Sequence, residues 1–156
     1  GAALDYENVM AELICDGIHV HPAVLRAAAK LFGPDRLMFI SDSMRAAGMP
    51  DGRYTLGGQE VAVRGRRAEL VSDGTLAGSV TPLPDCVRQA VQQAGLPLAF
   101  ALRCATFNPA RRLGVTEEMG LLAPGRRADL VLWTPQLETM AIFQNGRRVD
   151  PGEETR

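Results

Sequence analysis

Apolar and polar residues in the first part of the chain follow the pattern of a strand, a helix and a second strand. A mostly apolar run at residues 9–14 predicts a buried strand, and a second run at residues 37–40 predicts another. Between them, Pro22 suits the first position of a helix, apolar residues follow at helical spacing, and Gly33 stands where a C-cap belongs. A strand-helix-strand unit of this length implies parallel strands joined by a right-handed crossover.

Beyond Gly48 the apolar runs are shorter, and turns that contain glycine separate them. Strands are predicted at residues 53–56, 59–64 and 68–71. Short strands that follow one another through tight turns pair antiparallel. The sequence therefore predicts a small antiparallel insertion over about residues 53–72.

Helical spacing returns after this insertion. Thr81-Pro82 opens a predicted helix that ends before Gly95, and Pro97 begins another that runs to Ala105. A short turn is predicted at residues 108–114.

The last part of the chain has the pattern of strands. They are predicted at residues 128–133, 140–143 and 147–149. Asn145-Gly146, between the last two, is a strong signal for a two-residue hairpin turn. The polar residues 151–156 predict a frayed tail.

The composition is that of an ordinary globular protein, and it narrows the classes of partner. Of 156 residues, 46% are hydrophobic and 22% are charged, and the formal net charge of -1 lacks the basic excess of a nucleic-acid surface. Arginine doublets such as Arg66-Arg67 are scattered among acidic residues, which favours solvated surface charge. No apolar run approaches the roughly 20 residues that a membrane span needs. We therefore expect neither a nucleic acid nor a membrane as a partner.

Three cysteines, Cys15, Cys86 and Cys104, bear on the cellular compartment. An odd number without a C-x-x-C pair indicates neither a disulfide framework nor a zinc knuckle. We expect buried, reduced thiols in a cytoplasmic protein.

Polar residues follow both predicted parallel strands. Asp16 and His19 come after the first strand and Asp42 after the second, at the strand ends where parallel α/β proteins gather functional groups. A Ser-Asp-Ser sequence is also a good cap for the turn that follows, so these residues alone leave the role of Asp42 open. The small residues of the loop at 75–79 allow close approach to a ligand, but in isolation the loop is interpreted as an ordinary connector.

Both histidines of the chain, His19 and His21, flank a single valine. Side chains two positions apart on a strand face the same side, so the pair could contribute to a metal site. A catalytic metal takes three protein ligands, however, and the nearby candidates are only Asp16 and Asp42. We therefore interpret His19 as a substrate contact and His21 as the start of the following helix.

Three segments together resemble the N-acetylglucosamine-6-phosphate deacetylases of the amidohydrolase superfamily. They are Asp-Gly-Ile-His-Val at residues 16–20, Ser-Asp-Ser-Met at residues 41–44 and Leu-Ala-Gly-Ser at residues 76–79. Residues 106–114 and 120–131 also fit, although they resemble many amidohydrolases that carry an accessory β-sandwich. Relatives often have Thr-Asp-Ala-Thr in place of the second segment, and the acid is retained here.

The resemblance implies an α/β fold, with the C-terminal portion of a (β/α)8 TIM-type barrel over residues 1–114 and strands of an accessory β-sandwich over residues 115–150. The antiparallel insertion would belong to the barrel portion. His19 would follow the seventh barrel strand and Asp42 the eighth. The complete enzyme would hold a divalent metal, zinc or iron, through ligands on earlier strands, so no metal ligand is expected in this chain.

The implied reaction is hydrolysis of the N-acetyl group of N-acetylglucosamine 6-phosphate, giving glucosamine 6-phosphate and acetate. Asp42 would be the catalytic base and acid in the attack of water on the amide. The residues implied at the substrate are Asp16, Gly17, Ile18, His19, Leu76, Ala77 and Gly78. The implied partners are the amino-sugar phosphate, the missing N-terminal part of the protein and further copies in a homo-oligomer.

Two other hypotheses remain open from the sequence. The chain could belong to an amidohydrolase that acts on another cyclic amide or amine. It could also be a non-catalytic oligomerisation or binding piece, which the absence of metal ligands favours. With two barrel strands and no complete ligand set, the chain alone is expected to be inactive.

Overall fold

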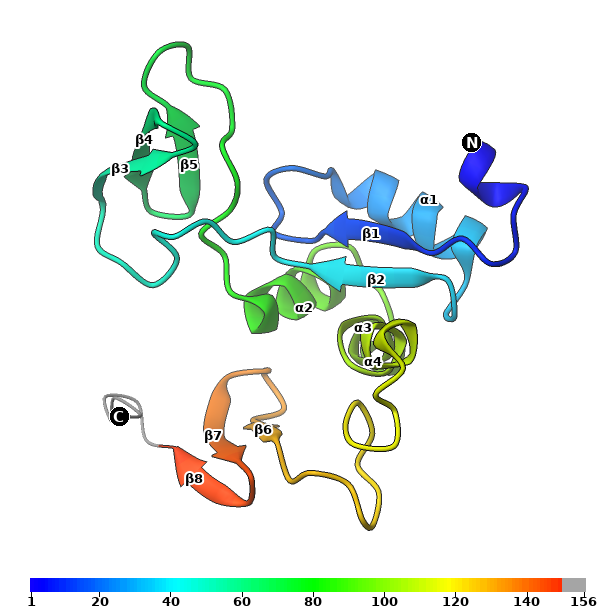
Figure 1. Ribbon diagram of the computed structural model, residues 1–156. Coiled ribbons are helices and arrows are strands. Elements are labelled where there is room, and N and C mark those ends of the chain that lie inside the picture. The colour runs from blue at the N-terminus through cyan, green and yellow to red at the C-terminus, as the bar shows by residue number, and fades with distance from the viewer. Residues whose placement is uncertain (150–156) are drawn as a thin grey trace. The chain divides into compact units, whose positions relative to one another are not determined.

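The computed structural model describes residues 1–149, which form short helices and three small sheets (Figure 1). The chain divides into two compact units, residues 1–108 and the residues from 109 onward. The predicted tail at 151–156 lies outside the described residues. The predicted domain boundary after residue 114 stays a prediction.

A parallel pair of strands forms the centre of the first unit, as the strand-helix-strand pattern predicts. β1 (Ala11–Ile14) pairs with β2 (Leu37–Ile40), with Ile14 opposite Ile40, and α1 (Pro22–Phe32) connects them. A short 3-10 helix, η1 (Ala2–Leu4), precedes β1. Figure 1 shows the two arrows side by side and pointing the same way, so both strands end at the same edge of the sheet.

Both ends of α1 follow from the sequence. His21 lies just before the helix, and its Nδ1 accepts a hydrogen bond from the backbone N–H of Ala23 at 3.2 Å. Pro22 takes the first helical position, where the missing N–H costs no hydrogen bond. Gly33 ends the helix with a φ of 68°, a backbone conformation that favours glycine. The interpretation of His21 as the start of a helix is confirmed.

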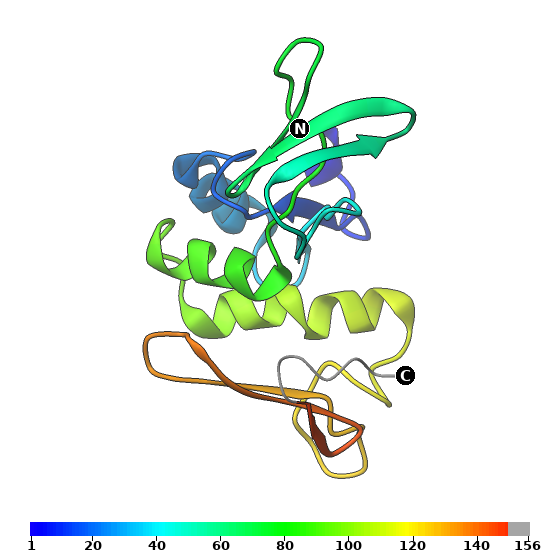
Figure 2. The same cartoon turned by 90° about the vertical axis from the view of Figure 1, so that its left-hand side faces the viewer.

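Two further helices pack against β2. α2 (Leu83–Gln92) and α3 (Leu98–Ala105) also lie side by side, as the green and yellow-green helices of Figure 2. Their buried side chains are small or medium-sized, which lets the helices approach the strand and each other closely; they are Cys86, Val87, Ala90, Ala101 and Cys104.

The two parallel strands are buried to very different extents. Leu37, Met38 and Phe39 of β2 are each at most 5% exposed, because α2 and α3 cover them. The residues of β1 are half-buried or exposed, and the strand begins only at Ala11. The prediction of a buried strand over residues 9–14 is therefore wrong in its start and in its burial, because among the described residues β1 pairs only with β2.

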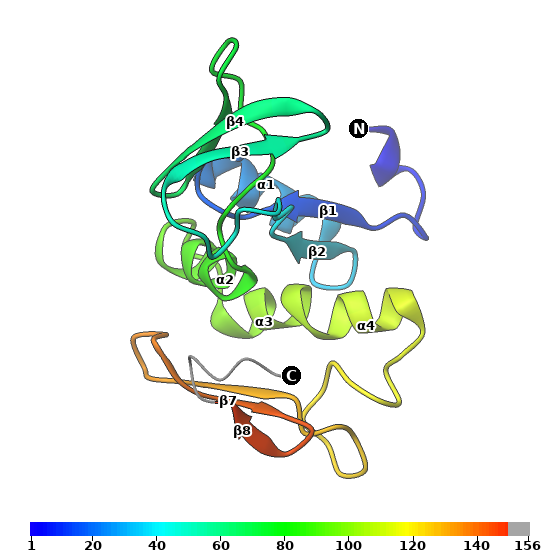
Figure 3. The same ribbon diagram turned by 60° about the vertical axis from the view of Figure 1, so that its left-hand side comes forward.

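The predicted antiparallel insertion is confirmed. β3 (Gly52–Leu56), β4 (Gln59–Arg64) and β5 (Arg67–Leu70) pair in that order, and Figure 3 shows β3 and β4 as a twisted hairpin. The turn between β3 and β4 is Gly57-Gly58, where both residues have positive φ. A two-residue turn of this kind has the twist that antiparallel strands require.

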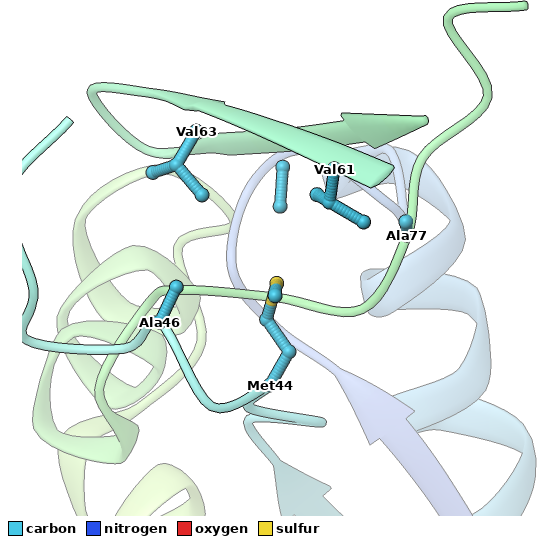
Figure 4. Close-up of a cluster of buried hydrophobic side chains, with 6 residues drawn as sticks. Met44, Ala46, Val61, Val63 and Ala77 are labelled. Carbon is cyan, nitrogen blue, oxygen red and sulfur yellow. The ribbon is translucent and has the colours of Figure 1, made fainter. Parts of the chain in front are cut away.

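The insertion has a hydrophobic core of its own, the insertion core (Figure 4). Its buried members are Met44, Ala46, Val61, Val63, Ala68 and Ala77. The first two of these residues follow the end of β2, and the last belongs to the segment after β5. The insertion is therefore packed onto the chain that leaves the parallel sheet.

A helix replaces the turn predicted at residues 108–114. α4 (Phe107–Leu113) contains Pro109 as its third residue, where the backbone N–H of a helix has no partner within the helix. The prediction of a turn is wrong because a proline in the first turn is compatible with a helix. Asn108 is fully buried, and its Nδ2 donates hydrogen bonds to the carbonyls of Pro34 and Leu37, both at 2.7 Å.

The second unit contains an antiparallel sheet. β6 (Leu130–Trp133), β7 (Thr139–Gln144) and β8 (Arg147–Val149) pair in chain order. Asn145 and Gly146 have φ values of 50° and 77° in the turn between β7 and β8. The predicted hairpin is confirmed, since a turn with positive φ at both central residues is the one that Asn-Gly favours.

Replacement of Asn108 by alanine should weaken the first unit strongly. The carbonyl of the buried Leu37 and that of the exposed Pro34 would lose their donor, so the free energy of unfolding should fall by about 1–3 kcal/mol in urea denaturation of the full-length protein. Thr106→Ala is the matched control, because the exposed Thr106 hydroxyl donates to the carbonyl of Leu102 at 2.8 Å. The control should lose less than about 1 kcal/mol. Equal losses for the two variants would contradict the anchoring role of Asn108.

Candidate functional site

Asp16 lies buried in the loop that follows β1, and its carboxylate accepts three hydrogen bonds. Oδ1 accepts from the backbone N–H groups of Ile18 at 2.9 Å and His19 at 3.0 Å, and Oδ2 lies 2.7 Å from Nδ1 of His19. Burial raises the pKa of Asp16, but these hydrogen bonds and the attraction of His19 outweigh it, so the pKa lies below its usual range. Asp16 is therefore an ionised group inside the protein at neutral pH.

The buried carboxylate fixes the ring of His19. Because Nδ1 faces Asp16, the hydrogen-bond network favours the proton on Nδ1 and leaves Nε2 as the outward nitrogen. The side chain of His19 remains 19% exposed. His19 can thus offer Nε2 as an acceptor when the ring is neutral and as a donor when it is protonated.

Asp42 follows β2 and has an exposed side chain on a constrained backbone. Its φ of 53° lies in the left-handed region, which is unfavourable for most residues other than glycine. The backbone N–H of Ser79 donates to the carbonyl of Asp42 at 2.9 Å, and the N–H of Met44 donates to the carbonyl of Ser79 at 2.8 Å. We call this pair of hydrogen bonds the Ser79 clamp; it holds the backbone of Asp42 while its carboxylate faces solvent.

The small-residue loop before α2 lies directly against Asp42. Ala77 packs in the insertion core, and its backbone N–H donates to the carbonyl of Ala68 at 3.0 Å. Gly78 has a φ of 66°, and a Cβ at this position would lie 3.2 Å from Cβ of Met44 and 3.5 Å from the carbonyl oxygen of Asp42. Only a glycine satisfies both the backbone angle and the close approach.

The structure places the sequence-predicted residues in two groups at one edge of the parallel sheet. Asp16 to His19 form one loop after β1, and Gly78 lies beside Asp42 after β2, while Leu76 and Ala77 pair with β5 of the insertion. Both carboxylate oxygens of Asp16 accept hydrogen bonds from its own loop, so Asp16 supports the ring of His19 from inside the protein. Contact of these residues with a substrate stays a prediction.

The described residues do not fit a catalytic metal. No group of three His, Cys, Asp or Glu side chains within residues 1–149 could hold a metal ion. Asp16 and His19 are paired with each other, and His21 begins α1. A catalytic metal takes three protein ligands.

The cysteines do not supply a nucleophile. Cys15, Cys86 and Cys104 are unpaired and buried, as expected from the sequence. Burial raises the pKa of Cys86 to about 11 and that of Cys104 to about 12, and it also raises the pKa of Cys15. These thiols are therefore protonated at neutral pH.

No helix among residues 1–149 is both long enough and apolar enough to cross a membrane.

Arg66 is a residue of this region that the sequence analysis missed. It was interpreted as solvated surface charge, but its Nη2 donates a hydrogen bond to the backbone carbonyl of Asp16. Arg66 is nevertheless exposed, so its interpretation as surface charge is confirmed, and this hydrogen bond adds to it. No spacing in the sequence could have shown this contact, because it joins the turn between β4 and β5 to the loop after β1.

Comparison with known proteins gives a family match over nearly the whole chain. The model of the amidohydrolase family matches residues 8–151. The N-acetylglucosamine-6-phosphate deacetylase of Caenorhabditis elegans is 42% identical over 137 residues, which make up 88% of this chain and 32% of that protein. The N-acetylgalactosamine-6-phosphate deacetylase of Escherichia coli O157:H7 is 42% identical over 147 residues, 94% of this chain and 38% of that protein.

Solved structures agree with these relatives. A mutant N-acetyl-D-glucosamine-6-phosphate deacetylase from Mycobacterium smegmatis, solved in complex with N-acetyl-D-glucosamine-6-phosphate, superposes with a TM-score of 0.87 and 39% identity. The match covers 94% of this chain and 39% of that one. The chain thus spans between 32% and 39% of the length of these three proteins. Neighbours of this kind imply a TIM-barrel type of fold for the protein.

Replacement of Gly78 by alanine should disturb the backbone of Asp42. The positive φ alone costs about 1–2 kcal/mol for alanine, and the new Cβ would also press on Met44. Gly74→Ala is the matched control, since Gly74 has a φ of 76° and a Cβ there would meet nothing within 4 Å. We expect Gly78→Ala to lower the free energy of unfolding by about 1 kcal/mol more than the control, measured by urea denaturation. Indistinguishable losses would mean that the contact with Met44 imposes no constraint.

Proposed function

The chain belongs to the amidohydrolase family, in its branch of amino-sugar-phosphate deacetylases, and from this premise we propose that it carries the general base of an enzyme that hydrolyses N-acetylglucosamine 6-phosphate. The observation that carries the proposal is the exposed carboxylate of Asp42 on a backbone that the Ser79 clamp holds at the end of β2. The ordered Asp16–His19 pair follows the neighbouring strand at the same edge. The products are glucosamine 6-phosphate and acetate.

Asp42 carries the proton through the reaction. Its carboxylate accepts a proton from the attacking water as the water oxygen bonds to the carbonyl carbon of the acetamide. The protonated Asp42 then gives this proton to the amine nitrogen as the bond between carbon and nitrogen breaks. An amine leaves readily only after it has been protonated, so a single carboxylate can serve both steps.

His19 orients the substrate in this proposal. Its Nε2 hydrogen-bonds the acetamide group, while Asp16 holds Nδ1 and so fixes the direction of the ring. We assign Asp16 to this positioning role, because its oxygens are already engaged inside the loop. Gly17 and Ile18 complete the loop, and Leu76, Ala77 and Gly78 close the site beside Asp42.

The rest of the catalytic machinery lies outside this chain in our proposal. Residues 1–114 would form the C-terminal portion of the barrel and residues from 115 the strands of an accessory β-sandwich. Two features support this division. Within residues 1–149, β1 and β2 pair only with each other, whereas barrel strands pair on both edges. The sheet of β6 to β8 also leaves Val131, Leu132 and Met140 exposed by 45%, 48% and 62%, as expected for strands that lack a covering layer.

The metal and the assembly are also assigned to the complete enzyme. Because the donor groups of residues 1–149 do not fit a catalytic metal, the divalent metal that the family implies, zinc or iron, would be held by other residues. We propose a homo-oligomer, since exposed strand edges and apolar faces favour association. The buried, unpaired cysteines suit a reducing compartment, and we place the enzyme in the cytoplasm.

The C4 epimer is a second candidate substrate. The relative named as an N-acetylgalactosamine-6-phosphate deacetylase is as similar to this chain, at 42% identity, as the relative named for N-acetylglucosamine 6-phosphate. Acetate release from both sugars by the full-length protein would decide between them through the ratio of the two kcat/KM values. The proposed chemistry of Asp42 is the same for both.

Asp42→Asn should remove most of the activity of the full-length enzyme. A neutral amide cannot accept the proton of water, so kcat should fall by about 10²–10⁴-fold while KM changes little. Asp5→Asn is the matched control, because Asp5 is exposed and lies outside the loops after β1 and β2. Activity of Asp42→Asn within about tenfold of wild type would contradict the general-base role.

His19→Asn and His21→Asn should behave differently. The first substitution removes the ring that Asp16 orients, and kcat/KM for acetate release should fall by about tenfold or more. The second leaves asparagine at the position before α1, where asparagine is itself a favoured helix cap, so the activity should stay near that of wild type. Large and equal losses, together with loss of bound metal, would instead support a metal site made by both histidines.

A further inference from the structure

The loop from Asp16 to His19 depends on a tight backbone turn. Gly17 has a φ of 77°, which turns the next two backbone N–H groups toward Oδ1 of Asp16. The same turn brings Nδ1 of His19 to within 2.7 Å of Oδ2. The orientation of the peptide between Asp16 and Gly17 therefore governs whether the Asp16–His19 pair forms.

Arg66 holds this peptide from outside the loop. Its Nη2 donates to the backbone carbonyl of Asp16, across 50 positions of sequence. A hydrogen bond from a guanidinium is stronger than one between neutral groups, because the donor carries a positive charge. The contact fixes the carbonyl end of the peptide whose other end is the nitrogen of Gly17.

The turn that carries Arg66 is itself anchored. The backbone N–H of Gly65 donates to both carboxylate oxygens of Asp51, at 2.9 and 3.0 Å. The sheet behind the turn is packed through the insertion core onto Met44, two residues after Asp42 (Figure 4). The insertion thus contacts the loop of His19 through Arg66 and the backbone after Asp42 through its core.

We propose that Arg66 is a positioning residue, through which the antiparallel insertion sets the Asp16–His19 pair relative to Asp42. This inference rests on the proposed function, in which His19 and Asp42 act on the same acetamide. The insertion is then a frame that holds two loops of the site in place. Arg66 acts through Asp16 and does not itself touch the reacting atoms.

The test compares Arg66→Met, Arg66→Lys and Arg67→Met in the full-length enzyme. Methionine keeps much of the apolar length of arginine but cannot donate to the carbonyl of Asp16, whereas lysine can. Arg67 is the adjacent control, since its guanidinium pairs with Glu69 on the surface at 2.8 Å. Hydrogen exchange is measured without substrate for peptides that cover residues 15–20, α2 and the β3–β5 sheet, and kcat and KM are measured for acetate release.

Arg66→Met should speed exchange at the amides of Ile18 and His19, which donate to Asp16, and should leave exchange in α2 unchanged. It should also lower kcat about tenfold, the rate equivalent of one lost hydrogen bond to a charged donor. Arg66→Lys should show slower exchange and a higher kcat than Arg66→Met. Arg67→Met should match wild type in both measurements.

Three results would overturn the inference. Unchanged exchange at residues 16–19 would show that Arg66 does not hold the loop. If hydrogen exchange became faster to the same extent throughout the β3–β5 sheet, Arg66 would contribute only to the stability of that sheet. A rise in KM with kcat unchanged would instead indicate direct binding of the substrate phosphate. A wild-type enzyme without deacetylase activity would overturn the proposed function, and the exchange data would still report whether Arg66 orders the loop.

Discussion

The parallel pairing of β1 with β2 is the interaction on which the candidate site depends. Parallel strands end at the same edge of a sheet, so the loop after Ile14 and the loop after Ile40 leave from neighbouring points. The crossover helix α1 is required by this topology, and α2 and α3 bury β2 from the side. An antiparallel pairing of the same two strands would place Asp16 and Asp42 at opposite edges, and no shared site could form.

The two aspartates at this edge have opposite environments and therefore different chemistry. Asp16 is buried, and three hydrogen bonds keep it ionised and directed at His19. Asp42 is exposed, and the hydrogen bonds around it involve its backbone, which leaves its carboxylate open to a substrate. In the proposed function, a single residue type thus supplies an orienting group and a proton carrier, because burial and hydrogen bonding decide what a carboxylate can do. The unfavourable φ of Asp42 persists because Ser79 and the insertion core hold the surrounding chain.

Local pattern in the sequence determined most elements of the fold. The strand at residues 37–40, the helix that starts at Pro22 and the hairpin at Asn145-Gly146 all form where apolar spacing and turn residues predict them. Such signals involve only a few neighbouring residues, so they can be recognised without knowledge of the rest of the chain. The turn expected at residues 108–114 is instead α4, because a proline in the first turn of a helix removes no hydrogen bond within it. The motifs that resemble the deacetylases also led to the family that the comparisons show.

The surroundings of the candidate site residues were decided only by tertiary structure. The sequence by itself determined that Asp16, His19 and Asp42 follow parallel strands, and it could not distinguish a substrate contact from a buried support. Asp16 is buried by residues that are distant in sequence. The hydrogen bond of Arg66 to its carbonyl and the Ser79 clamp on Asp42 also join distant residues, and no periodic pattern in the sequence indicates such contacts. The physical reason is that burial and long-range hydrogen bonds are properties of the packed chain, in which the insertion core brings the turn between β4 and β5 back to the parallel sheet.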